Sequence, residues 1–204
     1  MFDTIDTDVV STNKIFTDAE FLELNGMVHW ASLGLINDHG EELYLINPDI
    51  SYVIDLARNQ VDPFVFENVL SDDVLYATPA QSANDILQIR GLVTEFCGER
   101  PNFWAHCGAY DTVVLKSSIF GRMIDAPKLW PYVTNEISLV FALAGVDDND
   151  YPRQDSELPK HNSLTDTRHL KRVYNSILAD AIAGKYNKSR TIREIMLANP
   201  GRRD

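Results

Sequence analysis

Three short runs of strand-forming residues, separated by tight turns, constrain the fold of this chain more than any other feature. The runs cover residues 14–22, 28–36 and 43–46. The Asn25-Gly26 pair between the first two runs is a strong signal for a two-residue β-hairpin turn. Consecutive strands joined by such short turns favour an antiparallel meander.

Beyond the meander, the pattern changes from alternation to helical periodicity. Thr78 and Pro79 suit the start of one helix, and Gly98 suits its end. Residues 147–160 are the one long polar stretch, and we expect a mobile loop there. A strand meander followed by helices predicts an α/β domain, with a mixed sheet and helices packed against it. The predicted helices cover residues 63–70, 79–97, 109–120, 163–183 and 189–197, with a short strand at 102–107 and an apolar segment at 137–146.

Composition excludes several classes of protein. Hydrophobic residues make up 45% of the 204 residues, which is enough for a sizeable core. No apolar run approaches the roughly 20 residues of a membrane span. The two cysteines, Cys97 and Cys107, provide neither a disulfide framework nor a CxxC metal pair, so we expect a cytoplasmic protein without membrane contact. A net charge of −12 argues against a protein that coats nucleic acid through bulk charge.

Charge is distributed unevenly along the chain. Lys and Arg outnumber Asp and Glu by 10 to 4 in residues 160–204, although the chain as a whole is acidic. We predict a flexible N-terminal extension at residues 1–13, one folded domain at 14–184, and a basic tail at 185–204 with a short helix. The tail either meets a phosphate backbone or is the solvated face of a last helix.

Asp18 and Glu20 interrupt the first predicted strand. Residues two apart on a strand point to the same face, so the two carboxylates lie together while Ala19 and Phe21 point away. Paired carboxylates repel unless a cation shares them, and oxygen ligands of this kind suit Mg²⁺ or Mn²⁺. In a chain with 30 acidic residues, an Asp-x-Glu pattern also arises by chance, so the pair needs further context.

Three further residues provide that context. Asp111 begins a predicted helix after a short strand, where it either meets the helix dipole or adds a third acid to the pair. Asp166 shares the buried face of the long C-terminal helix with Leu170, and a buried carboxylate needs a partner. His161 precedes it in the loop, where it is either a surface histidine or a base that takes a proton from water.

In order and context, these five residues resemble the site of the DEDDh 3′–5′ exonucleases. The resemblance includes the acidic pair on the first strand of a meander, "AHCGAYD" at residues 105–111 and "HNSLTD" at 161–166. Within that superfamily the chain looks like the single-domain bacterial and phage exoribonucleases related to RNase AS, the polyadenylate-specific 3′-exoribonuclease. The segments that carry this closer similarity are "DAEFLELNG", "FWAHCGAYDTVVL", "FGRMIDAPKLWP" and "HNSLTDTRHLKRVY".

The resemblance implies a fold and a mechanism. Residues 14–184 would form an exonuclease domain with an RNase H-like mixed sheet. Asp18, Glu20, Asp111 and Asp166 would hold two Mg²⁺ or Mn²⁺ ions, and His161 would act as general base on the attacking water. Single-stranded RNA would then be shortened from its 3′ end, releasing nucleoside 5′-monophosphates. Relatives of RNase AS are dimeric, which implies a homodimer.

The chain departs from the family pattern at two positions. Ala19 stands where relatives often have Thr, on the strand face away from the ligands, so we expect little effect. Cys107 stands where the wider superfamily often has Asn, so a substrate contact from that position is in doubt.

Substrate-binding residues are less specified by the sequence. Phe21 could stack on the terminal base, although its alternation favours core packing. Trp104 and Tyr110 face the same choice, and core packing is again the commoner outcome for such residues. The basic tail is the candidate for holding the upstream backbone, through Lys185, Lys188, Arg190 and Arg193, or it forms a subunit interface.

Other functions remain open. The same chemistry could act on single-stranded DNA, since no reader of the 2′-hydroxyl is visible in the sequence. A non-catalytic nucleotide- or RNA-binding module of the same fold, or a structural adaptor without metal, would also carry these residues. The sequence does not specify base preference or a preference for poly(A).

Overall fold

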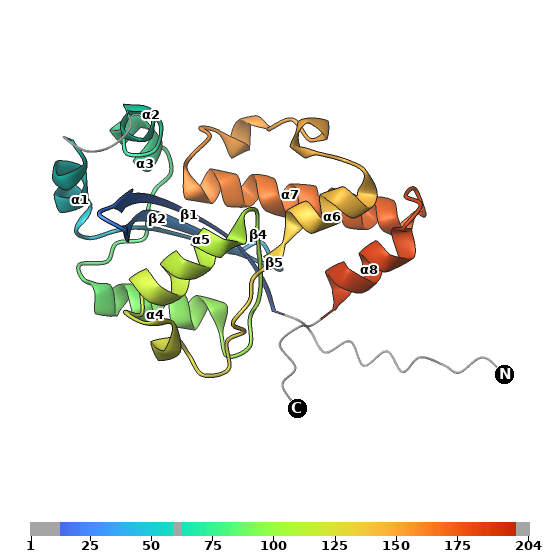
Figure 1. The fold of residues 1–204 in the computed structure, drawn as a ribbon, viewed down its shortest axis with the longest axis horizontal. Coiled ribbons are helices and arrows are strands. Elements are labelled where there is room, and N and C mark those ends of the chain that lie inside the picture. The colour runs from blue at the N-terminus through green and yellow to red at the C-terminus, as the bar shows by residue number, and fades with distance from the viewer. Residues whose placement is uncertain (1–12, 59–62, 199–204) are drawn as a thin grey trace.

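The computed structural model describes residues 13–58 and 63–198 of the chain. The described residues form one five-stranded mixed sheet in the order β3-β2-β1-β4-β5, with helices packed on both of its faces (Figure 1). The strands are β1 (Lys14–Leu24), β2 (Met27–Asn37), β3 (Glu42–Ile46), β4 (Asn102–Ala105) and β5 (Asn135–Glu136). The α/β expectation is therefore confirmed. The predicted N-terminal extension lies outside the described residues, apart from Asn13.

The first three strands form the predicted antiparallel meander. Asn25 and Gly26 both have positive φ angles, 54° and 74°, as a tight hairpin turn requires. The β1–β2 register shifts after Glu20, where Ala31 of β2 is an extra residue between the partners of Glu20 and Phe21. This irregularity is a β-bulge beside the acidic pair, and bulges bend a strand where they occur. On the other side of β1, β4 pairs in parallel.

The helices divide into three groups around the sheet. The N-terminal group is α1 (Ile50–Ala57), α2 (Pro63–Asn68) and α3 (Asp72–Leu75). The middle group is α4 (Ile86–Cys97), α5 (Gly108–Val113) and the π-helix that continues it, Val114–Ser118. The C-terminal group is α6 (Ile137–Ala144), α7 (Ser163–Ile182) and α8 (Ser189–Leu197), with 3₁₀ turns at Met123–Asp125, Asp148–Asp150 and Asp155–Glu157.

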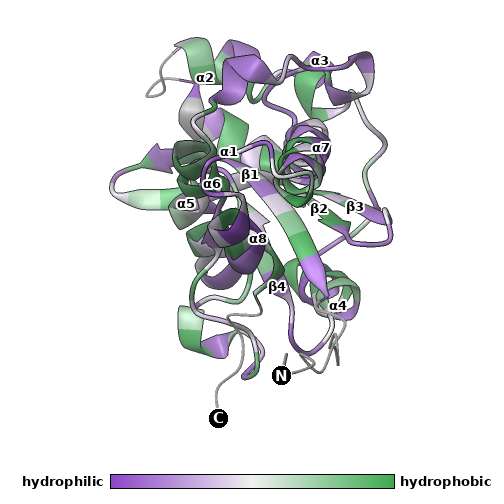
Figure 2. Ribbon diagram, turned by 90° about the vertical axis from the view of Figure 1, so that its right-hand side faces the viewer, coloured by the Kyte–Doolittle hydropathy of each residue, from purple (hydrophilic) through white to green (hydrophobic). Residues whose placement is uncertain are grey.

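Each face of the sheet has its own core. On one face, Ile15 and Ala19 of β1 pack with residues of α4 and of the π-helix. On the opposite face, Phe16 packs with Trp104 and with the buried stripe of α7, to which α6 and α8 add further side chains. A third cluster joins Leu22 and Leu24 to the N-terminal helices. Figure 2 looks along α7 and shows both hydrophilic and hydrophobic residues along β1. This strand lies between the core on the α4 side and the core on the α7 side of the sheet.

Several predicted boundaries were wrong. The helix predicted at residues 79–97 begins at Ile86, because the side chain of Asp85 accepts hydrogen bonds from the backbone N–H groups of Leu87 and Gln88 and caps it there. Gly98 ends this helix as predicted. The helix predicted at 109–120 is divided between α5 and the π-helix. Helices α1 and α3 and the two-residue strand β5 were not predicted.

The C-terminal region is more ordered than predicted. The short helix expected at residues 189–197 is present as α8, and its Ile192 and Met196 are fully buried against α6 and α7. Residues 185–198 are therefore packed on the fold and do not form a free tail; residues 199–204 lie outside the described range. Among the described residues, no helix is both long and apolar enough to cross a membrane.

Candidate active site

Strand alternation places the acidic pair as predicted. Asp18 and Glu20 share the strand face of Phe16, which packs on Tyr174 of α7 at a ring-centroid distance of 5.0 Å. Ala19 and Phe21 point to the opposite face, toward the α4 core. The pair therefore lies on the side of the sheet that α7 covers.

Gly34 allows α7 to approach this pair closely. It is paired with Asp18 in the β1–β2 ladder. A side chain at this position would place its Cβ 2.3 Å from the backbone oxygen of Ser163 and 2.6 Å from the backbone nitrogen of Leu164, in the first turn of α7. The first turn of α7 can therefore lie directly on β2, and this turn carries Asp166 toward the acids of β1.

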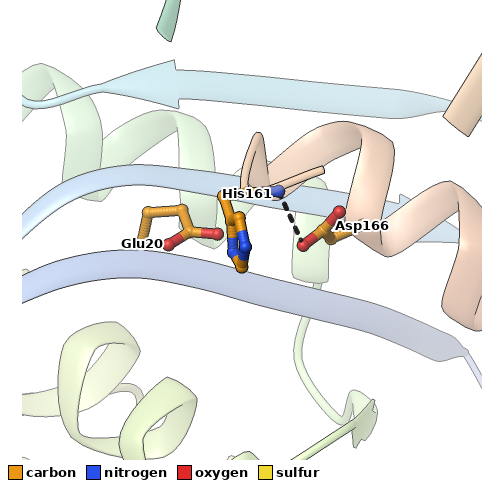
Figure 3. Close-up of side chains that lie close together, drawn as sticks. All are labelled: Glu20, His161 and Asp166. Atoms are coloured by element: carbon orange, nitrogen blue, oxygen red, sulfur yellow. Dashed lines mark hydrogen bonds between the residues drawn. The ribbon is translucent and has the colours of Figure 1, made fainter. Parts of the chain in front are cut away.

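Glu20, His161 and Asp166 point toward one another from three different segments (Figure 3). Ligand atoms of the three side chains all lie within 4.8 Å of one another. The backbone N–H of His161 donates to Asp166 Oδ2 at 3.2 Å. His161 itself has a positive φ of 66°, which turns the chain sharply just before α7. This group of a carboxylate, an imidazole and a second carboxylate could hold a divalent metal ion.

Asp111 approaches the same place from α5. Its Oδ1 accepts a hydrogen bond from the backbone N–H of Ala19 at 2.8 Å, and its side chain is buried. The carboxylate of Glu136, the last residue of β5, accepts hydrogen bonds from the backbone N–H groups of Cys107 and Gly108 at 2.9 and 2.8 Å. These bonds attach the β4–α5 connection to β5, while the bond from Ala19 attaches Asp111 to β1.

The carboxylates share one electrostatic environment. Burial, followed by the charges of Asp111, Glu20 and Asp166, raises the pKa of Asp18 well above its ordinary range. Burial also raises the pKa of Glu20 and that of Asp111 to about 8. Burial is the largest cause of each shift, and neighbouring carboxylates of the cluster add to it for Asp18 and Glu20, so a bound cation would favour the charged forms. Asp18 Oδ2 is buried and has no hydrogen-bond partner among the described residues.

His161 is suited to accept a proton. Partial burial lowers the pKa of its imidazole, so the ring is neutral near pH 7. Its ring lies edge-on to Phe64 of α2, with centroids 5.5 Å apart. A neutral imidazole among carboxylates can take a proton from water or coordinate a metal ion.

Arg153 is a residue of this site that the sequence reading missed. Its Nη1 donates to Asp166 Oδ1 at 2.5 Å and to the backbone oxygen of Glu157 at 3.1 Å. Arg153 and Lys160 line a cavity of about 170 Å³ together with Asp18, Asp166 and His106. In the sequence, the only signal for this contact is that the cationic residue Arg153 stands a short distance before the "HNSLTD" motif at residues 161–166.

The loop that carries Arg153 and His161 is anchored on α7, contrary to the expectation of a mobile loop. Glu157 is buried, with only 2% of its surface exposed. Its carboxylate pairs with Arg172 at 2.5 Å and with His169 Nδ1 at 3.0 Å, while His169 Nε2 lies 3.1 Å from Asp148. This ionic network fixes both ends of the segment between α6 and α7.

The aromatic candidates have different environments. Phe21 is partly buried against the α4 core, and its ring stacks on Tyr110 with centroids 4.8 Å apart. Trp104 is buried beside Tyr174, as the core-packing alternative predicted. Tyr110 differs from that expectation. It lies on the outer side of α5, and 49% of its surface is exposed.

The basic residues of the C-terminal region lie far from the acids. Asp166 is in the first turn of α7, and Lys185 follows the C-terminal end of this helix, about 25 Å away at 1.5 Å per residue. Lys185 pairs with Asp180, and Arg190 pairs with Glu194. Lys188 is at the start of α8, near the same end of α7. These side chains are not part of the acidic site.

The five residues singled out from the sequence therefore converge on one place between β1, α5 and the first turn of α7. The arrangement offers four carboxylates that could bind cations and a neutral imidazole that could transfer a proton. Metal-assisted hydrolysis uses groups of these kinds. In comparisons with protein-family models and with curated proteins, the sequence has no match.

Proposed function

We propose that this protein is a metal-dependent 3′–5′ exoribonuclease of the DEDDh type, similar to RNase AS. The observation that carries the proposal is the convergence of Asp18, Glu20, Asp111, His161 and Asp166, which are separated by up to 148 positions in the chain, around one buried place. Carboxylates gathered at this density are costly to a fold unless they bind cations.

The fold is compatible with the proposal. An antiparallel meander of three strands, extended by two strands parallel to β1, is the arrangement expected of an RNase H-like sheet. The acidic pair lies on the central strand, β1, which has neighbours on both sides. Residues on a central strand and on the first turns of two helices are held rigidly, as a catalytic constellation requires.

The donor set fits divalent cations. Asp18, Glu20, Asp111 and Asp166 would hold two Mg²⁺ or Mn²⁺ ions, since hard oxygen donors suit both. The unpartnered Oδ2 of Asp18 is available for such a ligand. When bound, the ions supply charge stabilisation for the phosphodiester and lower the pKa of water.

The protein's own residues supply position and proton transfer. His161, neutral and next to Glu20 and Asp166, would accept the proton of the attacking water. The Asp166 contact with the backbone N–H of His161 holds the loop that presents the imidazole. The products would be a nucleoside 5′-monophosphate and an RNA chain shortened by one nucleotide.

The test is hydrolysis of a 5′-labelled single-stranded RNA in the presence of Mg²⁺. We expect a ladder that shortens from the 3′ end. Glu20→Gln should lower the rate at least about 100-fold, because it removes a cation ligand. Glu23→Gln is the matched control on the same strand, since Glu23 is exposed and outside the site. Equal rates for both variants would contradict the proposal.

The substrates in this assay also decide among the alternatives. Poly(A), mixed RNA and single-stranded DNA of equal length should be compared, and faster hydrolysis of RNA supports the exoribonuclease. Equal rates on DNA would favour a general single-strand exonuclease. Nucleotide binding without turnover in Mg²⁺ or Mn²⁺ would favour a non-catalytic binding module. We also propose a cytoplasmic homodimer, which sedimentation of the purified protein tests for its oligomeric part.

A further inference from the structure

The strongest unexplained contact in the candidate site is the ion pair between Arg153 and Asp166. Nη1 of Arg153 lies 2.5 Å from Asp166 Oδ1, and the two side chains are 18% and 14% exposed. The positive charge of Arg153 also lowers the pKa of Asp18 and of Glu20, against the larger effect of burial. Arg153 therefore supplies a positive charge that partly offsets the acidic cluster.

Arg153 occupies a carboxylate oxygen that the proposed function needs for another purpose. A divalent ion bound by Asp166 would lie close to the guanidinium, and two positive groups on one carboxylate repel each other. Arg153 and the metal ion therefore compete for Asp166. Since the ion carries two charges and the guanidinium one, we expect the ion to displace the Arg153 side chain from this carboxylate.

The surroundings offer the displaced guanidinium a new position. The adjoining cavity of about 170 Å³ is lined by Arg153, Lys160 and His106, and also by the carboxylates of Asp18, Asp148 and Asp166. Once cations neutralise these carboxylates, the cationic side chains can bind an anion there. The backbone need not move, because Glu157, four residues further on, remains anchored to α7 by Arg172 and His169. A guanidinium pairs with phosphate through two parallel N–H···O bonds.

We propose that Arg153 exchanges partners during the reaction cycle. It pairs with Asp166 in the metal-free protein, and it pairs with a phosphate of the RNA, or of the nucleoside monophosphate product, once a divalent ion occupies Asp166. This inference rests on the proposed function, because it assigns a phosphate-binding residue to the same site. Arg153 thereby links metal binding to substrate binding.

Two binding measurements test the exchange without any measurement of turnover. Mn²⁺ is titrated into metal-free wild type and Arg153→Gln, and adenosine 5′-monophosphate is then titrated into both at saturating Mn²⁺. Arg153→Gln should bind Mn²⁺ at least about tenfold more tightly, because the competing cation is gone. It should bind the nucleotide about 10- to 100-fold more weakly, because a charged hydrogen-bond donor is lost.

The opposite signs of the two effects distinguish this role from a merely structural one, since a distorted site would lose affinity for both ligands. Arg153→Lys keeps the charge, so it should recover part of the nucleotide affinity and bind Mn²⁺ about as the wild type does. Arg153→Met replaces Arg153→Gln if the glutamine variant does not fold. Arg168→Gln is the control, because Arg168 also forms an ion pair from this part of the chain, with Glu42. Both affinities of the control should equal those of wild type.

The outcomes separate this inference from the proposed function. Unchanged Mn²⁺ affinity in Arg153→Gln, or unchanged nucleotide affinity, would overturn the exchange even if the wild type shortens RNA. A wild type that binds Mn²⁺ and nucleotide with the expected response to Arg153→Gln, but leaves RNA intact, would overturn the exoribonuclease and leave the exchange standing. Absence of Mn²⁺ binding in both proteins would overturn the exchange as well.

Discussion

At the scale of single residues, Gly34 helps to position the candidate site although it belongs to no polar or catalytic motif. It has no chemistry of its own, but the absence of a side chain allows the backbone of Ser163 and Leu164 to pack directly on β2. The atoms in the way of a Cβ are backbone atoms of α7, which cannot rotate aside as the end of a side chain can. The position of Asp166 relative to Asp18 thus depends on a glycine in another strand.

Gly34→Ala should therefore destabilise the protein and displace Asp166. We expect a loss of about 1–3 kcal/mol in the free energy of unfolding, the usual cost of overpacking, measured by urea denaturation. Mn²⁺ affinity should fall in the same variant. Gly91→Ala is the matched control, because nothing lies within 4 Å of a Cβ at this exposed position in α4. In that helix, alanine should be neutral or stabilising.

The acidic cluster gives the metal-free protein a characteristic pH dependence. The pKa values of Glu20 and Asp111 are raised to about 8 in the folded state, above their values in an unfolded chain. At a pH between the unfolded-state and the folded-state pKa of these carboxyl groups, the folded protein binds more protons than the unfolded one. Its free energy of unfolding therefore falls as pH rises. His161, whose pKa is lowered, acts in the opposite sense below about pH 6.5.

Between pH 6.5 and 8, the free energy of unfolding of the metal-free protein should thus fall by about 1–2 kcal/mol, as followed by urea denaturation at each pH. Saturating Mn²⁺ should abolish this fall, since bound cations replace the protons. Asp111→Asn should flatten the same profile, because it removes one of the two carboxyl groups whose pKa is raised to about 8. A profile that rises with pH in metal-free wild type would show that the carboxylates do not repel as described.

At the scale of elements, the segment between α6 and α7 combines polar composition with firm anchorage. Its sequence resembles a loop, yet two 3₁₀ turns and the Glu157 network attach it to α7. The carboxylate of Glu157 has its pKa lowered to about 2, with hydrogen bonds from Arg172, from a backbone N–H group and from His169 opposing the effect of burial. Helix α7 therefore carries the third acid at its start and also positions the loop with Arg153 and His161.

Glu157→Ala should release this segment. Removing one partner from a buried ionic network takes away the carboxylate that Arg172 and His169 share, so we expect a loss of about 3 kcal/mol in stability. Limited trypsin digestion should then cleave after Arg153 or Lys160, which are protected in the wild type by the anchored loop. Asp155→Ala, at an exposed position of the same 3₁₀ turn, should leave both stability and digestion unchanged. Cleavage at the wild-type rate in Glu157→Ala would argue against the anchor.

At the scale of the whole molecule, the acidic site and the basic C-terminal residues lie at opposite ends of α7. Helix α8 turns back along α7, and the Tyr174 hydroxyl donates to the backbone oxygen of Met196. The hydrophobic contacts of Ile192 and Met196 explain why this basic segment is packed on the fold. Its charges can contact only a nucleic acid long enough to run the length of α7.

The effect of the basic residues should accordingly depend on substrate length. Combined replacement of Lys185, Lys188 and Arg190 by Ala should leave the rate on a dinucleotide unchanged, since these residues lie near the end of α7 that is about 25 Å from Asp166. With a long single-stranded RNA, the triple variant should have a higher KM and a weaker salt dependence, because phosphate contacts release counterions. A slower rate on the dinucleotide would place these residues closer to the reaction than the structure does.

The sequence by itself determined most of the longer elements and the chemistry of the residues. Period-two alternation in residues 14–22 predicted which face Asp18 and Glu20 share, and the Asn25-Gly26 turn predicted the hairpin, because both depend on local geometry. Helices α7 and α8 were predicted with nearly their observed bounds from periodicity and flanking residues. The start of α4 was wrong because Thr78 and Asp85 are both acceptable caps and only packing selects between them.

The tertiary structure alone decided which residues meet. The contact of Gly34 with α7, the pairing of Arg153 with Asp166 and the anchorage of Glu157 join residues between 12 and 130 positions apart in ways that no local pattern encodes. The same holds for the distance between the acids and the basic end, which is set by the length of α7 and the direction in which α8 packs. Local sequence specifies conformation over a few residues, whereas the environment of a charge depends on everything folded around it.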